Sequence, residues 1–405
     1  MRRRRSIVVA MSPDAPVPAG RDPVHHDLQG YVDDLIAHGV RRVHTLAWRD
    51  LDDPDAGGSE VHADEFMRRW AAAGLEVLHR TSSARGLAST AHRNGYEVVR
   101  RGSRYSVFPR TIAAEVTHRM GPYDAVVEIW NGVPWFSPIW CRRPHITFLH
   151  HVHGPMWDQI LPGPLAAFGR GLESRLAPPF YRRTPTVTPS DATRDELIEL
   201  GFRPELVTAV SNGTDPRFHP GGEKTVQPSI IAVARLAPVK RLSLLIESAV
   251  AARREVPGLT LTIVGTGPER EELAQQVADA GASGWVTFAG HVAQDDLVAL
   301  YQRAWIVASA SLAEGWGLSL TEAAGCATPA VATDIRGHRS SVVDGVTGIL
   351  AAPSELHSAI VRVLTDGELR DRLARAARAR TEMMTWDQSA LGVIRVLHGV
   401  ARHAK

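Results

Sequence analysis

The sequence contains little cysteine and no long apolar run, and its charges nearly cancel. Its 405 residues include two cysteines, Cys141 and Cys326, far apart in the chain. We expect buried reduced thiols rather than a disulfide framework. No apolar stretch approaches the roughly 18 residues that a membrane-spanning helix needs. The 46 Lys and Arg residues nearly balance the 44 Asp and Glu residues, so net charge does not indicate a nucleic-acid partner, and none is expected.

The first residues resemble a secretion signal only superficially. "MRRRRSIVVAMSPDAPVP" has a basic start and an apolar stretch from Ile7 to Met11. That stretch is shorter than the roughly 7–15 residues of a true signal core, and no small-residue cleavage site follows. The sequence therefore predicts a cytoplasmic protein.

Short β-rich runs alternate with helical patterns from about residue 42, which predicts a parallel sheet covered on both faces. The alternation pauses at "VSNGTDPRFHPGGEKTVQPS", a linker by its Gly, Pro, Asn and Asp content. It then resumes from Ser229. The predicted fold class is α/β, with two facing Rossmann-like doubly wound domains and a cleft between them. The expected divisions are an N-terminal extension packed on the first domain (1–41), a first domain (42–212), a second domain (213–380) and a C-terminal helix crossing back to the first domain (381–405).

Two glutamates flank a predicted helix start in "EGWGLSLTEAAGCATP". Glu314 precedes Glu322 by eight residues, and the helix is expected to begin near Ser319. Free N–H groups at a helix start bind phosphate, and a carboxylate can accept both hydrogen bonds of a ribose diol. Glu322 is expected in the first turn of this helix, and the alternative to ribose binding is that it simply complements the helix dipole there.

Two cations follow the first strand of the second domain. Arg235 ends that strand in "VARLAPVK", and Lys240 is predicted to open the next helix. Together they could hold two phosphates, although solvated surface cations are the usual alternative. A lysine at a helix start opposes the dipole, so its position needs a reason.

Two glycine-containing turns are weaker signals. Gly265 belongs to a Gly-x-Gly turn in "IVGTGPERE", and Gly57 and Gly58 precede a predicted helix that Ser59 could cap. Each turn would let backbone approach a ligand closely.

Taken in order, "VARLAPVK", "IVGTGPE", "EGWGLSLTEAAGCATP" and "SVVDGVTGIL", with "DAGGSEVHADEFMRRWAAAGLEV" before them, resemble the retaining family-four glycosyltransferases, which have the GT-B fold. The resemblance extends from about Arg42 to the C-terminus. Two positions depart from the usual pattern, since Trp316 replaces Phe and Arg241 stands where Gly often follows the lysine.

The resemblance implies a nucleotide-sugar donor, UDP- or GDP-linked, that lies mainly on the second domain and is a co-substrate rather than a cofactor. It implies that Arg235 and Lys240 hold the diphosphate, Glu322 the ribose and Glu314 the donor sugar. The remaining implied donor contacts are the phosphate-capping backbone at Leu318 and Ser319, the base-framing His291 and Val292, the phosphate turn at Gly265, and Gly57 and Gly58, which would close on the donor from the first domain.

Three histidines follow a predicted strand in "ITFLHHVHGPMW". The resemblance places His150 beside the donor sugar and makes it a catalytic candidate with Glu314, Arg235 and Lys240. The alternatives are partly buried histidines bonded to backbone, or a metal site. Because alternate residues on a strand face opposite ways, His150 and His151 cannot share a metal without a bend, and no metal is predicted.

Other polar segments of the first domain carry less specific signals. The aspartates of "RDLDDPDAGG" are interpreted as a polar loop at the cleft mouth. Glu128 and Asn131 follow a strand and could meet an acceptor. "PPFYRRTP" could give a weak peripheral membrane contact, although a solvated turn is the simpler interpretation.

The predicted function is metal-independent transfer of a sugar with retained anomeric configuration, from a nucleotide-sugar to a small-molecule, glycan or lipid-linked acceptor. The leaving phosphate would take the acceptor's proton, so no side-chain base is required. The alternatives are a sugar-nucleotide epimerase of the same architecture and a non-catalytic sugar-nucleotide-binding homologue. The sequence leaves the oligomeric state open.

Overall fold

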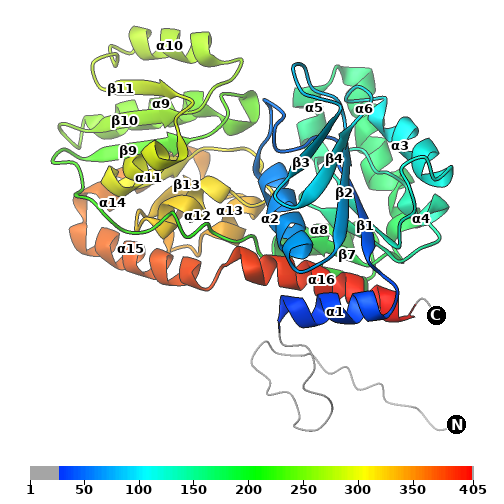
Figure 1. Cartoon of the computed structure of the whole chain (residues 1–405). Helices are drawn as coiled ribbons and strands as arrows, with labels where there is room; N and C mark the ends of the chain where they lie inside the picture. Colours follow the sequence, from blue (N-terminus) through cyan, green and yellow to red (C-terminus); the bar gives the residue numbers. More distant parts are fainter. Residues whose placement is uncertain (1–26, 404–405) are drawn as a thin grey trace, which may run out of the picture.

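The computed structural model describes residues 27–403, apart from the side chains of 155, 159 and 160. Two α/β domains lie side by side, and the long helix α16 (Trp386–His403) leaves the C-terminal domain and runs along one side of the N-terminal domain (Figure 1). Each domain is built on a sheet that is parallel apart from one edge strand of the first sheet, so the predicted architecture of two Rossmann-like domains is confirmed.

The N-terminal domain is built on an eight-stranded sheet of order β3-β4-β2-β1-β5-β6-β7-β8. Its central strands are buried along most of their length because helices cover both faces. The strands are β1 (Arg42–Leu46), β2 (Glu76–Thr81), β3 (Thr90–Arg93), β4 (Tyr96–Arg100), β5 (Ala125–Trp130), β6 (His145–Leu149), β7 (Thr186–Thr188) and β8 (Val207–Ala209). The helices are α1 (Leu28–Ala37), α2 (Gly58–Ala72), α3 (Val107–Val116), α4 (Ser137–Trp140), α5 (Trp157–Ile160), α6 (Gly163–Gly171), the π-helix η2 (Leu172–Leu176), α7 (Pro178–Tyr181) and α8 (Asp191–Glu199), with short 3-10 turns η1 (Gly154–Met156) and η3 (Pro204–Leu206).

One edge of this sheet departs from the predicted parallel arrangement. Strands β3 and β4 pair antiparallel around Asn94 and Gly95. Asn-Gly between two β-rich runs is a strong hairpin signal, so this antiparallel hairpin could have been predicted from the sequence. Strand β3 of the hairpin is the edge strand of the sheet.

The C-terminal domain has a six-stranded parallel sheet of order β11-β10-β9-β12-β13-β14. The strands are β9 (Ser229–Val233), β10 (Thr260–Val264), β11 (Val286–Gly290), β12 (Ile306–Ser309), β13 (Ala330–Thr333) and β14 (Gly348–Ala351). The helices are α9 (Leu242–Arg253), α10 (Arg270–Asp279), α11 (Gln294–Arg303), α12 (Leu318–Gly325), α13 (Arg336–Ser341), α14 (Leu356–Thr365) and α15 (Gly367–Glu382), with 3-10 turns η4 (Pro238–Lys240) and η5 (Pro353–Glu355).

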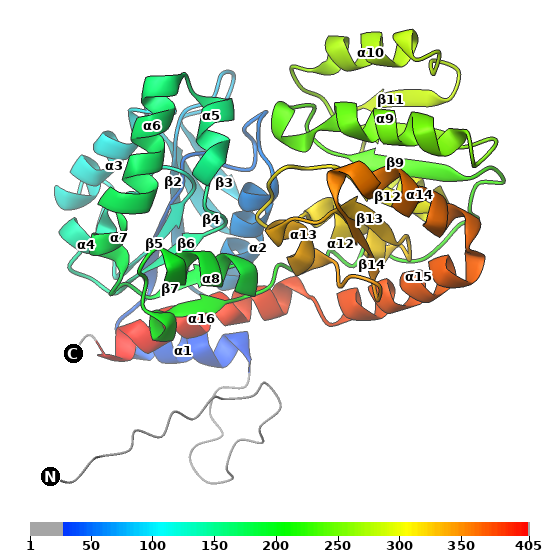
Figure 2. The same ribbon diagram turned by 180° about the vertical axis from the view of Figure 1, so that it is seen from behind.

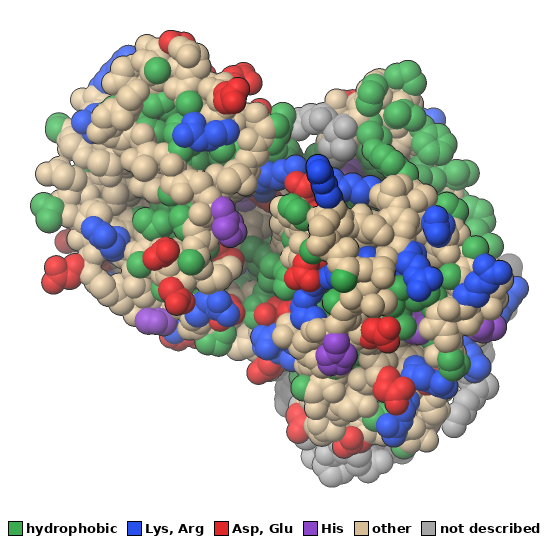
Figure 3. All heavy atoms as spheres, turned by 45° about the horizontal axis from the view of Figure 1, so that its top comes forward, with side chains coloured by type: hydrophobic (Ala, Val, Ile, Leu, Met, Phe, Trp, Pro, Cys, Tyr) green, Lys and Arg blue, Asp and Glu red, His purple; other side chains and the backbone are tan. Residues whose placement is uncertain are grey.

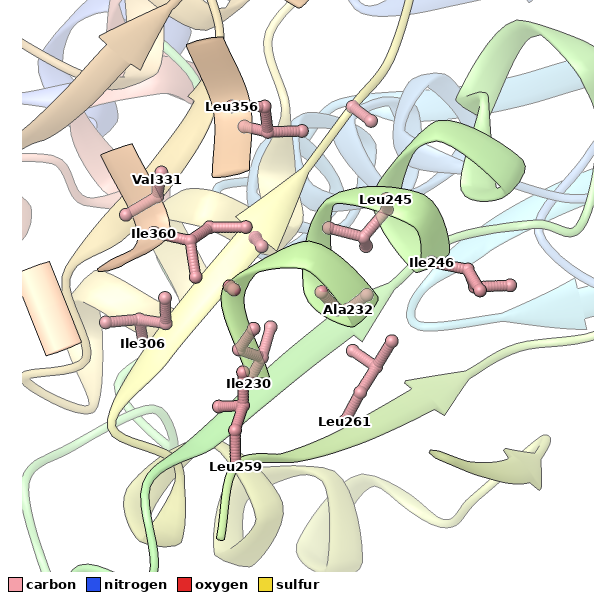
Figure 4. Packing of buried hydrophobic residues seen from close by; sticks show 14 of the residues in the cluster. Ile230, Ala232, Leu245, Ile246, Leu259, Leu261, Ile306, Val331, Leu356 and Ile360 are labelled. Carbon is pink, nitrogen blue, oxygen red and sulfur yellow. The ribbon is translucent and has the colours of Figure 1, made fainter. Parts of the chain in front are cut away.

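The largest core of this domain lies between one face of the sheet and helices α9 and α14. Figure 4 shows Leu245 and Ile360 from these helices packed with Ile230, Leu261 and other strand residues. This alternation of strand and helix packing fixes the carboxyl ends of β9, β10 and β12 at one edge.

Helix α16 packs on the N-terminal domain, although it follows the C-terminal domain in sequence. It contacts α1, α2 and β6 (Figure 2). The buried residues Val393, Ile394 and Leu397 join the N-terminal core. The first part of the predicted N-terminal extension, residues 1–26, lies outside the described residues, whereas α1 packs against α16.

Cys141 and Cys326 are free and buried, as the sequence predicts. Within residues 27–403, no helix combines the length and apolar character that crossing a bilayer requires.

Candidate functional site

The carboxyl ends of the C-terminal strands carry most of the predicted donor residues. Arg235 follows β9, Gly265 follows β10, His291 follows β11, and Glu314 lies beyond β12. Because these strands are parallel, all four residues lie at one edge of the sheet. In an open α/β sheet this edge is the ligand-binding edge.

Glu314 and Lys240 form the central ion pair of this edge. The Lys240 Nζ donates to Glu314 Oε1, and Ser311 Oγ donates to the same oxygen at 2.8 Å. Burial by itself would raise the pKa of Glu314, but Lys240, His338 and the Ser311 hydrogen bond outweigh it and lower that pKa. Glu314 is therefore a carboxylate at neutral pH, and Lys240 is oriented by it rather than free in solvent.

Glu322 is not a helix cap. It lies in the second turn of α12, the helix has no acidic residue in its first turn, and its N-cap Gly317 makes no side-chain capping bond. The predicted first-turn position was therefore wrong, because the helix starts one residue earlier than expected, and the dipole alternative fails with it. Glu322 Oε2 instead accepts from Tyr301 Oη at 3.0 Å. Burial raises the pKa of Glu322 to about 7, although the Tyr301 hydrogen bond acts in the opposite direction.

The start of α12 meets the Gly57–Gly58 turn of the other domain. The helix begins at Leu318, within one residue of the expected start near Ser319, and among residues 27–403 no acceptor bonds the backbone N–H of either residue. A Cβ placed on Gly58 would lie 2.9 Å from Leu318 Cδ1. Any larger residue at position 58 would press against the predicted phosphate seat.

The predicted Ser59 cap was wrong. Helix α2 begins at Gly58, and Gly57 N donates to the Glu60 carboxylate at 2.7 Å. Ser59 Oγ lies within the helix and accepts from Asn131 Nδ2 at 3.3 Å. Asn131 thus lies beside the glycine turn, at the cleft side of its strand.

His150 lies against the Glu314 loop. A Cβ on Gly315 would lie 2.7 Å from the His150 carbonyl oxygen, so the two loops touch across the domain boundary. The His150 ring is 5% exposed, and neither ring nitrogen has a partner among the described residues. Burial, with His62 and His151 adding to it, lowers the pKa of His150 well below its ordinary value. The ring is therefore neutral, and both of its nitrogens are available to hydrogen-bond a ligand.

His62 is a site neighbour that the sequence reasoning missed. It is buried on α2, its ring centroid is 5.2 Å from that of His150, and its Nε2 lies 3.2 Å from Ser389 Oγ of α16. Burial lowers the pKa of His62 to about 3. The available signal was helical spacing, because His62 and Phe66 share the buried face of α2.

His151 and His153 have separate surroundings. Their ring centroids lie 4.4 Å apart, and burial lowers the pKa of His151 to about 3. Glu173 accepts from the backbone N–H groups of His153 and Gly154, both at 2.9 Å. Glu173 therefore holds the loop that carries the three histidines. Within residues 27–403, no group of three or more His, Cys, Asp or Glu side chains is arranged to hold a metal ion.

The aspartate loop after β1 is neutralised by arginines. Arg100 donates to Asp50 at 2.6 Å and to Asp52 at 2.7 Å. Asp55 pairs with Arg104 of its own domain and, at 3.0 Å, with Arg235 of the C-terminal domain. The loop lies at the domain boundary, as interpreted from the sequence, and it engages one of the two predicted phosphate-binding cations.

Lys240 ends the turn η4 and does not open a helix, so that prediction was wrong by one element. Arg241, which follows it, has φ 44° and serves as N-cap of α9. This left-handed conformation explains why glycine suits the position. The Arg241 Nε donates to Ala310 O at 2.8 Å, which ties the turn to the loop carrying Glu314.

Gly265 supports Arg235 through close backbone contact. A Cβ there would lie 2.0 Å from Ala234 O, at a φ of +131°. The Gly-x-Gly turn therefore packs directly on the segment that carries Arg235. His291 is exposed and Val292 half-buried beside this turn, at the far end of the same edge.

Glu128 does not face the cleft, so the suggested acceptor role was wrong. Its side chain is fully buried and accepts from Trp135 N at 3.0 Å, Ser137 N at 3.1 Å and Tyr181 Oη at 2.6 Å. Burial raises its pKa. Glu128 holds the turn that follows β5.

Two family models match adjoining parts of the chain. The model for "Glycosyltransferase Family 4" matches residues 56–218, and the model for "Glycosyl transferases group 1" matches residues 216–380. A D-inositol 3-phosphate glycosyltransferase of Frankia alni is 28% identical over 87% of this chain and 97% of its own length. A glycogen synthase of Mycobacterium tuberculosis is 34% identical, over 52% of this chain and 53% of its own length.

Solved structures share the fold at low identity. Sucrose-phosphate synthase from Thermosynechococcus elongatus superposes with a TM-score of 0.72 at 19% identity, covering 87% of this chain and 97% of that one. Anabaena HepE, solved with UDP and glucose, gives 0.69 at 20% identity, covering 89% of this chain and all of that one. The two matched models, the two-domain fold and the named relatives agree: the chain belongs to the family-four glycosyltransferases of GT-B fold and is a sugar-transferring enzyme.

Proposed function

We propose that the enzyme transfers a sugar from a UDP-sugar, with retained anomeric configuration, to a hydroxyl of its acceptor. The observation that carries the proposal is the convergence of Lys240, Glu314 and His150 at the domain boundary. Anabaena HepE has been solved with UDP and with UDP-glucose, which favours UDP over GDP as the nucleotide. The glycosyltransferase names of the relatives favour transfer over the epimerase and non-catalytic alternatives.

The diphosphate would bind between Arg235, Lys240 and the start of α12. The Arg235 side chain is 50% exposed and that of Lys240 is 23% exposed, and the N–H groups of Leu318 and Ser319 would complete the anion site. Charge grows on the leaving phosphate as the sugar bond breaks, and fixed positive groups lower the energy of that state. The proton of the acceptor hydroxyl would pass to the departing phosphate oxygen, on the face where the new bond forms.

Glu322 would accept hydrogen bonds from the ribose hydroxyls, and Glu314 would accept from a hydroxyl of the donor sugar. Glu314 suits this role because it is ionised. The neutral His150 ring can donate from one nitrogen and accept at the other. Asn131 lies beside the glycine turn on the first domain, so the acceptor would enter from that side.

The acceptor remains a small molecule, a glycan or a lipid-linked sugar in this proposal. The test is incubation with UDP-glucose, UDP-N-acetylglucosamine and GDP-mannose in the presence of candidate acceptors, with proton NMR of the product's anomeric signal. An α-configured product from an α-configured donor supports retention. A β product would overturn retention while leaving the transferase assignment intact.

A further inference from the structure

The outer face of the N-terminal domain carries a concentration of exposed apolar side chains. The most exposed are Phe168 (65%), Leu165 (55%) and Leu176 (54%), followed by Ile139 and Phe180. They lie on α6, η2, α7 and α4, which contact one another in that order. Figure 3 shows hydrophobic side chains gathered at the outer edge of this domain. An exposed apolar patch of this kind marks an interaction site more often than chance.

Basic side chains outnumber exposed acids in these helical segments, and the exposed Asp158 of α5 is paired with Arg170 of α6. Between Asp158 and Asp191 the only acidic residue is Glu173, which is buried against the histidine loop. Five exposed arginines belong to the same helices and their ends, and none forms an ion pair with any residue in 27–403: Arg142, Arg143, Arg175, Arg182 and Arg183.

We propose that this surface, the α4–α7 face, docks the enzyme on an anionic lipid bilayer. Apolar side chains would enter the headgroup boundary while the arginines contact lipid phosphates. The face extends the weak membrane contact suggested by "PPFYRRTP" to four helical segments, with Phe168 and Leu165 as its most apolar part. It is independent of the proposed donor and of the acceptor's identity.

The charge pattern argues against a second copy of the chain as the occupant. A twofold dimer places the same patch on both partners. Its arginines would then face the same arginines of the partner copy, while the exposed Asp158 is already paired with Arg170 and Glu173 is buried. An anionic bilayer complements the apolar residues and the charges together.

The test is sedimentation of the full chain with vesicles. One set contains phosphatidylcholine alone, and the other contains about one third phosphatidylglycerol. We expect at least about tenfold tighter binding to the anionic vesicles, weakened by added salt. Phe168→Ser with Leu165→Ser, and separately Arg182→Glu with Arg183→Glu, should each weaken binding about tenfold or more.

Matched controls lie on the C-terminal domain. Val226 is 92% exposed, and Arg254 is exposed and free of ion pairs among residues 27–403. Val226→Ser and Arg254→Glu should bind as the wild type does. A further variant replaces Arg2, Arg3, Arg4 and Arg5 with Ala, because a basic N-terminus could bind anionic vesicles by itself. Thermal unfolding midpoints check that each variant folds.

Three outcomes overturn the proposal. The first is equal binding to both vesicle types, or binding to neither. The second is loss of binding only in the Arg2–Arg5 variant, with the α4–α7 variants unaffected. The third is a concentration-dependent dimer, seen by sedimentation velocity, that Phe168→Ser with Leu165→Ser dissociates, because the patch would then be a self-association surface.

Discussion

Asp55 of the N-terminal domain forms an ion pair of 3.0 Å with Arg235 of the C-terminal domain. The hydrogen bond from Arg104, followed by the nearby Arg235 and Arg49, lowers the pKa of Asp55 despite partial burial. Asp55 is therefore charged at neutral pH. The Asp55 carboxylate of the N-terminal domain is thus paired with an arginine of the C-terminal domain that we propose binds the donor diphosphate.

This pair sets the first prediction. Asp55→Asn should strengthen UDP binding by about two- to fivefold, because Arg235 is released and a negative charge is removed from the phosphate seat. The gain is small since exposed pairs contribute only about 0–1 kcal/mol. Calorimetric titration measures it, with Asp195→Asn on α8 as a matched control. Weaker binding in Asp55→Asn would show that the pair supports the site instead of competing with it.

Glu322 gives a prediction about stability and pH. Its pKa is raised to about 7 in the folded state, above the ordinary value near 4.3 in an unfolded chain. Folding therefore favours the protonated form. The resulting cost to stability is absent below about pH 4, grows as pH rises toward 7, and is full above 7.

Glu322→Gln removes that cost and can still accept from Tyr301. We expect the variant to be about 1–3 kcal/mol more stable than the wild type at pH 8, with the difference vanishing near pH 4.5. Urea unfolding at both pH values measures this. Equal stabilities at pH 8 would mean that Glu322 is not held in a desolvated site.

His150→Phe tests the histidine at the boundary. Phenylalanine fills the space beside Phe148 and His62, whose rings lie 4.5 Å and 5.2 Å from that of His150, so the fold should persist. We expect turnover to fall about 100-fold or more while UDP affinity changes less than about threefold. Steady-state kinetics with the acceptor found by NMR, beside calorimetry of UDP, separates the two effects. Unchanged turnover would make His150 a packing residue.

Glu128→Gln tests a structural role. The glutamine amide would present a donor where two backbone N–H groups now donate, so the variant should lose about 2–4 kcal/mol of stability. Activity per folded molecule should stay near that of the wild type. Urea unfolding and kinetics at low temperature measure these together. A variant that is as stable as the wild type but inactive would show that Glu128 takes part in substrate binding or catalysis.

Much of the donor edge could be predicted because it depends on strand order alone. Alternating strands and helices imply parallel sheets, and parallel strands bring Arg235, Gly265 and Glu314 to one edge. Glu322 was predicted in the first turn of α12 rather than the second because the helix start depends on Gly317, whose left-handed conformation is not visible in the sequence. Likewise, the sequence predicts that Lys240 opens a helix, whereas α9 starts only after the 3-10 turn that Lys240 ends.

Contacts between the domains could not be predicted. Asp55 and Arg235 are 180 positions apart, and their pairing depends on how two separately folded sheets meet. Glu128 was misassigned since a polar residue near a strand end could face either the cleft or the following turn. Its three buried hydrogen bonds appear only once Tyr181 packs beneath that turn.

The most direct test of the donor site is calorimetric titration of UDP into the wild type and Lys240→Ala, with uridine as the ligand that lacks phosphate. The account predicts that the wild type binds UDP with a micromolar Kd. It also predicts that Lys240→Ala weakens UDP by about tenfold or more, or about 1.4 kcal/mol, and leaves the weak binding of uridine unchanged. If UDP does not bind, or binds both proteins equally, Lys240 is not part of a diphosphate site and the assignment of this edge as the donor site is wrong.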